Sequence, residues 1–122
     1  MTSSVAELAS DVYSIRLGLV DIRKQPTAEQ RARVERLYAQ KYAELARRDQ
    51  AYWRQDEIPD LVVGALGRII AEELCSGIGM PVPTEADDTS GQEVSIGTKG
   101  RRLLARLLAR ERTGLPTQAE YF

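Results

Sequence analysis

The side chains that most often perform catalysis are scarce in this sequence. The 122 residues include no histidine and a single cysteine, Cys75. Histidine is the commonest general base and the commonest metal ligand in proteins. Without it, the usual zinc sites and the Ser-His and Cys-His nucleophile pairs cannot be assembled within this chain. The composition therefore argues against these chemistries, and we expect no cofactor.

Carboxylates are the remaining candidates, and one group precedes an apolar segment. Asp56, Glu57 and Asp60 lie close together in "RQDEIPD". They could serve a carboxylate enzyme, in which one acid acts as general base. Acidic residues at this position are also explained as caps at the positive end of a helix. We favour the capping role and expect the protein not to be an enzyme.

A second group of carboxylates lies in the polar stretch 80–97. Four acids give residues 85–93 a net charge of −4: Glu85, Asp87, Asp88 and Glu93. Their spacing does not match the ligand positions of an EF-hand loop. We therefore expect no metal site. The two prolines and the small polar residues of this stretch predict a long, mobile loop.

Length and composition predict one folded domain. A chain of 122 residues can build one core, and 43% hydrophobic with 29% charged residues is ordinary for a soluble protein. A lone cysteine fits a reducing compartment, where Cys75 serves as a small buried residue. No apolar run is long enough to span a membrane, so we expect neither secretion nor membrane insertion.

Apolar periodicity predicts four helices that position these residues. The expected ranges are 4–17, 27–50, 59–77 and 98–112. Ser4 with Glu7, and Thr27 with Gln30, have the spacing of capping boxes, and Thr98 is a candidate cap for the last helix. Strand signals are weak, since "EVSI" is too short to build a sheet. The predicted fold class is all-α, a bundle of about four helices with a mobile loop and an extended C-terminal tail.

The third helix is expected to occupy the centre of the bundle. Its apolar residues cover well over half of its circumference. Gly64 and Gly67 predict a close helix crossing, because glycine in mid-helix otherwise costs about 1 kcal/mol. Gly77 and Gly79 are candidate stops. The predicted core residues are Trp53, Leu61, Leu66, Ile69 and Ile70.

The fourth helix combines a leucine stripe with a basic face. Six basic residues and one glutamate give residues 98–112 a net charge of +5; the basic residues are Lys99, Arg101, Arg102, Arg106, Arg110 and Arg112. This face could be simply solvated, or it could contact nucleic acid or an acidic protein surface. A membrane surface is disfavoured because the stripe has no aromatic anchor. The mixed-charge flank of the second helix could similarly be solvated or meet a neighbouring subunit.

The end of the sequence, "TGLPTQAEYF", has the character of a docking segment. Pro116 stiffens it, which lowers the entropic cost of binding. Tyr121 and Phe122 are of the type that anchors interfaces. Folding back on its own domain is the alternative. We divide the chain into a helical domain, residues 1–112 with a loop at 80–97, and a docking tail, residues 113–122.

The order of these features resembles the head-to-tail adaptor (connector) proteins of tailed bacteriophages, particularly the short-tailed type. The similarity is carried by "ELASDVYSIRLGL", the "PTAEQ" cap, "YWRQDEIPDLVVGAL" and "TKGRRLLARLLARE", and it covers nearly the whole chain. The resemblance implies a dodecameric ring beneath the portal of the virion, at the head–tail junction, assembled in the cytoplasm of the bacterial host.

The resemblance also implies partners and roles. The ring would extend the DNA channel, make transient non-specific contact with DNA, and provide a platform for tail or nozzle proteins. The tail would dock on the portal protein through Leu115, Pro116, Tyr121 and Phe122. The basic face of residues 98–112 would meet the portal or the DNA. The alternative function is a small helical DNA-binding regulator that uses the same basic helix.

Overall fold

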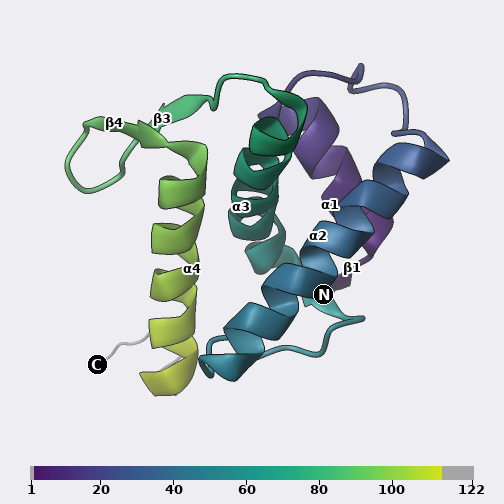
Figure 1. Ribbon diagram of the computed structural model, residues 1–122. Helices are drawn as coiled ribbons and strands as arrows, with labels where there is room; N and C mark the ends of the chain where they lie inside the picture. The colour runs from purple at the N-terminus through teal and green to yellow at the C-terminus, as the bar shows by residue number, and fades with distance from the viewer. Residues whose placement is uncertain (1, 114–122) are drawn as a thin grey trace.

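The computed structural model describes residues 2–113, in which helices pack around α3 and two short strand pairs lie at the edges (Figure 1). The helical elements are α1 (Val5–Ser10), η1 (Asp11–Arg16), α2 (Ala28–Arg47), α3 (Asp60–Ile78) and α4 (Ile96–Thr113). The strands are β1 (Thr2–Ser3), β2 (Ile58–Pro59), β3 (Thr84–Ala86) and β4 (Glu93–Ser95). The mostly helical fold is as predicted, but the two antiparallel pairs, β1–β2 and β3–β4, correct the purely all-α bundle.

Helix α3 forms the centre of the fold because most of its surface is apolar. It packs against α1, η1, α2 and α4, and Val62, Leu66 and Ile70 are fully buried. The helix continues through Gly77 and is capped by Gly79, whose φ of 71° is left-handed. The Gly79 amide donates to a carbonyl of the last turn.

Leu61 is a predicted core residue that the structure places on the surface. Its side chain is 70% exposed, whereas the other four predicted core residues are buried: Trp53, Leu66, Ile69 and Ile70. Successive helical residues point about 100° apart. The buried face of α3 begins at Val62, so Leu61 projects beside that face. The prediction is wrong here because Leu61 is apolar but lies off the buried stripe.

The first predicted helix changes its winding halfway along. Ser4 and Glu7 form the expected capping box at the start of α1. From Asp11 onward the helix is π-helical, a wider winding that closes i→i+5 bonds. In this register Arg16 Nε donates to Asp11 Oδ2 at 3.0 Å, which gives the largely buried Asp11 a charged partner.

Helix α2 begins at the predicted capping box. The Thr27 hydroxyl accepts a hydrogen bond from the Gln30 amide, and the Gln30 side chain accepts one from the Thr27 amide. The helix ends before the predicted residue 50. Asp49 has a positive φ of 56°, which a continuing right-handed helix does not allow.

An aromatic cluster ties the segment after α2 back onto that helix. Trp53 Nε1 donates to the Tyr38 hydroxyl at 3.1 Å, and that hydroxyl donates to the Gln55 carbonyl at 2.6 Å. The Tyr42 hydroxyl donates to the Trp53 carbonyl at 2.6 Å. Burial raises the pKa of Tyr38, which keeps this hydroxyl protonated and able to donate. These bonds fix the path of the chain toward α3.

A hydrogen-bonded hairpin lies within residues 80–97, where the sequence predicts a mobile loop. Strands β3 and β4 pair antiparallel, with Glu85 opposite Val94. Ile96 follows β4 directly, is fully buried, and its amide donates to the Pro83 carbonyl at 3.1 Å. The expectation that "EVSI" cannot build a sheet is therefore wrong. Each strand has only three residues, too few to show an alternating pattern.

Helix α4 lies antiparallel to α3 (Figure 1) and approaches it closely. Its first turn is capped by Ser95, whose hydroxyl accepts from the Thr98 amide at 3.2 Å, and not by Thr98 as predicted. A Cβ added at Gly100 would lie 2.6 Å from the Ala65 carbonyl oxygen. The close crossing predicted at Gly67 also exists, but against the Asp11 carboxylate of η1.

Candidate interaction surfaces

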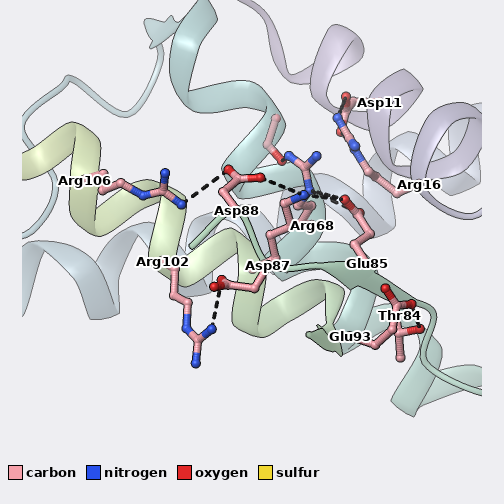
Figure 2. A network of polar contacts seen from close by, with 12 residues as sticks. Asp11, Arg16, Arg68, Thr84, Glu85, Asp87, Asp88, Glu93, Arg102 and Arg106 are labelled. Atoms are coloured by element: carbon pink, nitrogen blue, oxygen red, sulfur yellow. Dashed lines mark hydrogen bonds and ion pairs between the residues drawn. The ribbon is translucent and has the colours of Figure 1, made fainter. Parts of the chain in front are cut away.

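Part of the basic face of α4 is paired with carboxylates of the acidic β3–β4 hairpin. Figure 2 shows Arg102 and Arg106 reaching from α4 toward Asp87 and Asp88 of the hairpin. Arg102 Nη1 lies 2.9 Å from Asp87 Oδ1, and Arg106 Nη2 lies 3.4 Å from Asp88 Oδ2. Both arginine side chains remain about half exposed, at 51% and 50%. The two charged segments that stood out in the sequence are therefore partners of each other.

Partly buried charged side chains connect the hairpin to α3 and α4. Lys99 Nζ lies 3.5 Å from Glu85 Oε1 and 3.5 Å from Asp88 Oδ1. Arg68 of α3 lies on the other side of Glu85, with its Nε 3.2 Å from both carboxylate oxygens. Charges that leave water need such partners, because an unpaired buried charge is costly. Arg68 thus fastens the hairpin to the central helix.

Asp87 organises the turn of the hairpin as well as its contact with α4. Its Oδ2 accepts from the amides of Thr89 and Ser90 at 3.1 and 3.0 Å, while its Oδ1 faces Arg102. The side chain is almost completely buried. The hydrogen bond from Arg102, followed by that from the Ser90 amide, holds the pKa of Asp87 well below its usual range. Asp87 therefore stays ionised throughout the physiological pH range.

The other acids and bases of the hairpin region have separate roles. Glu93 accepts from the Thr84 hydroxyl at 2.9 Å, and Figure 2 shows this pair apart from Arg102 and Arg106. The Glu72 carboxylate accepts from the Ser95 hydroxyl and lies 3.9 Å from Arg101 Nη2. Arg110 is an exposed residue of α4, and Arg112 lies in the same helix, with a side chain beyond the described part of the structure.

One end of the molecule exposes a group of large apolar side chains, here called the connector surface. Figure 1 shows the end of η1, the connector 17–27 and the C-terminal end of α3 at the same end of the molecule. Its exposed apolar residues are Ile15, Leu19, Ile22, Ile78 and Val82. Ile22 is 75% exposed. Large apolar side chains that remain exposed at one end of the molecule make this end a candidate contact surface.

A second apolar surface, here called the α3–α4 groove, lies toward the other end of α3. Its walls come from both helices, with Leu61 and Gly64 facing Leu103 and Leu107. Arg68, Arg106 and Arg110 belong to the same lining, so the groove has apolar walls and a basic margin. The exposure of Leu61 therefore makes sense as part of a groove and not as an isolated surface leucine.

The acids Asp56, Glu57 and Asp60 are surface residues beside β2. Asp60 Oδ1 accepts from the Ser3 hydroxyl at 2.6 Å, which joins the start of α3 to β1. Asp60 lies in the first turn of α3, yet this turn has no side-chain cap. The predicted capping is therefore wrong. Asp60 still lies at the positive end of the α3 dipole, where a negative charge is favourable.

Several sequence predictions fall outside what the structure describes. The proposed docking residues Leu115, Pro116, Tyr121 and Phe122 belong to this group, since description ends at residue 113.

Cys75 is buried, as the sequence predicts, and burial raises the pKa of its thiol. Among the described residues, no helix combines the length and apolarity that crossing a membrane requires.

Sequence reasoning identified the charged segments but not their pairing. The usable signal was the proximity of a −4 stretch at 85–93 to a +5 stretch at 98–112, which the intervening turn brings together. The contribution of Arg68 carried no such signal, because Arg68 is a single basic residue within an apolar stretch and belongs to no charged segment. Comparisons of the chain with family models, with curated proteins and with solved structures found no match.

Proposed function

We propose that this protein is a head-to-tail adaptor of a tailed bacteriophage. Its subunits would form a ring under the portal, extend the DNA channel and carry tail or nozzle proteins. Residues 115–122 would dock on the portal protein. The sequence resemblance supports this proposal, and so does the presence of two surfaces with exposed apolar residues.

The position of the two apolar surfaces is the observation that carries the proposal. Ile78 of the connector surface and Leu61 of the α3–α4 groove are residues of the same helix, near its opposite ends. At 1.5 Å per residue, they lie about 26 Å apart along α3. The two surfaces are thus different in composition and well separated.

Such a pair of surfaces suits assembly from head to tail. A subunit whose surface A binds surface B of the next copy makes heterologous contacts, which close into a ring when the rotation permits. The connector surface would meet the α3–α4 groove of its neighbour. Burial of an exposed leucine or isoleucine side chain contributes about 1.5–3 kcal/mol, so several of them supply a useful part of the contact energy.

The DNA-binding regulator receives less support from the contacts of α4. A sequence-reading helix needs side chains that reach base edges. Here Lys99, Arg102 and Arg106 are engaged by carboxylates of the same chain. A regulator would have to give up these ion pairs before it could bind DNA.

Complementary variants test head-to-tail assembly directly. Ile22→Asp alters the connector surface and Leu61→Asp alters the groove, so each variant alone should remain monomeric at concentrations where the parent protein associates. An equimolar mixture should form dimers, because one intact surface of each kind remains, and these dimers should not grow further. Sedimentation velocity distinguishes monomers of the single variants, dimers of the mixture and the larger assemblies of the parent protein.

The exposed polar residue Gln25 offers a matched control in the connector. Gln25→Asp adds the same charge near Ile22 and should associate like the parent protein. Association that survives both apolar substitutions, or a parent protein that is monomeric at every concentration, would contradict the proposed contact.

A further inference from the structure

We propose that the β3–β4 hairpin masks a phosphate-binding row on α4 and so keeps the affinity of the protein for nucleic acid low. The row consists of Lys99, Arg102 and Arg106. The mask consists of the carboxylates that contact them. Binding to the row needs neither a ring nor a portal, so it is tested on the protein alone; Arg106 also lines the α3–α4 groove.

The row has the geometry of a binding surface for a nucleic-acid backbone. Lys99, Arg102 and Arg106 are spaced three and four residues apart, which places them on one face of α4. They extend over about 10 Å of helix, a length over which a strand presents several phosphates at about 3.4 Å of rise each. Guanidinium groups bind phosphate oxygens in a bidentate manner, as they bind carboxylates. The regular spacing of the row along one helix face is therefore what favours a repeating phosphate backbone.

The mask is held in place by bonds that do not involve the row. Asp87 is fixed by the amides of the turn, and Glu85 is fixed by Arg68 of α3. The buried Ile96 anchors the hairpin to the core. Asp87 and Glu85 therefore remain beside the cations without any further ordering, whereas Asp88 is held by its contacts with Lys99 and Arg106 themselves.

Competition from these tethered carboxylates explains why binding would be weak. A phosphate must displace a group held next to the cation at an effective concentration of about millimolar or higher. Non-specific binding to DNA is itself weak, with a Kd of about 10⁻⁴ to 10⁻⁶ M. A conduit for DNA benefits from this balance, because the surface stays cationic enough to tolerate phosphates without retaining them.

Asp88 is the best residue at which to test the mask. It contacts two members of the row, with Lys99 at 3.5 Å and Arg106 at 3.4 Å, and it is half exposed. Asp88→Asn should strengthen binding of the full chain to a fluorescent DNA duplex about tenfold at 50 mM salt. The slope of log K against log salt should steepen by about one, since Lys99 stays paired with Glu85 and the freed Arg106 adds one phosphate contact of about 0.9.

Glu93 provides the matched control because it belongs to the same hairpin and bonds to Thr84 instead of α4. Glu93→Gln changes the net charge equally and should leave DNA binding at the parent level. Asp88→Asn combined with Arg106→Gln should lose the gain. Far-UV circular dichroism checks that each variant is folded, and Glu85→Gln offers a second unmasking substitution.

Three results would overturn the mask. Asp88→Asn and Glu85→Gln could both bind DNA no better than the parent protein. The Glu93→Gln control could show the same gain, which would indicate a general charge effect. The unmasked variant could prefer a polyglutamate peptide to DNA at equal salt, which would assign the row to acidic proteins.

Discussion

Asp87 shows how much one carboxylate can do in a small hairpin. It accepts hydrogen bonds from two amides of its own turn and receives the guanidinium of Arg102 from α4. The same contacts that shape the turn also join it to the helix. The shape of the turn and its contact with α4 therefore both require an ionised Asp87. This requirement makes the hairpin sensitive to acid.

The protein should lose stability in acid partly through Asp87. Its pKa is depressed in the folded state, chiefly by Arg102, and is about 3.9 for an unfolded aspartate. The stabilisation is therefore fully present above about pH 5 and declines as the pH falls through 4 and below. Melting temperatures measured from pH 7 to pH 2 should fall more gently for Asp87→Asn, which starts from a lower value at pH 7. Parallel curves for the two proteins would contradict this role.

Residue roles could be predicted where they depend on close neighbours in sequence. The capping boxes of Ser4 and Thr27 were predicted because both partners lie three residues apart. Leu61 and Asp87 were not correctly assigned, because their contacts with α4 depend on how that helix is placed against α3 and the hairpin. Their roles depend on helix packing, which one apolar stripe does not determine.

At the scale of elements, the contact between α3 and α4 determines the stability of the hairpin surface. Gly100 brings the two backbones together, and Arg68 of α3 then reaches Glu85 while Lys99 of α4 reaches the same carboxylate. Spreading the helices would separate these two cations from their shared partner. The crossing and the ion pairs therefore support each other.

Two glycine substitutions should have opposite effects on stability. Gly100→Ala places a Cβ 2.6 Å from the Ala65 carbonyl oxygen and should destabilise the protein by about 1–3 kcal/mol. Gly77→Ala, in α3, meets no atom within 4 Å and should stabilise it by up to about 1 kcal/mol through helix propensity. Urea denaturation measures both values. A neutral Gly100→Ala would show that the helices can separate without cost.

The long helices were predictable from sequence, and the strands were not. Helices α2, α3 and α4 carry apolar periodicity over many turns, which is a strong signal. Strands β3 and β4 have three residues each and depend on each other for hydrogen bonds. The π-helical winding of η1 was not predicted either. It accompanies the contacts of Asp11 with Arg16 and Gly67, and the apolar spacing of the sequence does not reveal it.

At the scale of the whole molecule, three separate surfaces surround one central helix. The connector surface and the α3–α4 groove are apolar, and the hairpin presents paired charges along α4. We assign the first two to contacts between copies and the third to a surface that nucleic acid passes. Such a division of roles is the one expected of the proposed adaptor subunit.

The most direct test of the adaptor function is co-sedimentation of the full chain with the portal protein encoded in the same genome. We expect the protein to sediment with portal rings and to add a ring of density below them in negative-stain images. A chain that ends at residue 114 should lose this binding while its far-UV circular dichroism stays unchanged. Full portal binding without residues 115–122 would contradict the docking role of that segment, and no binding by the intact chain would contradict the adaptor function itself.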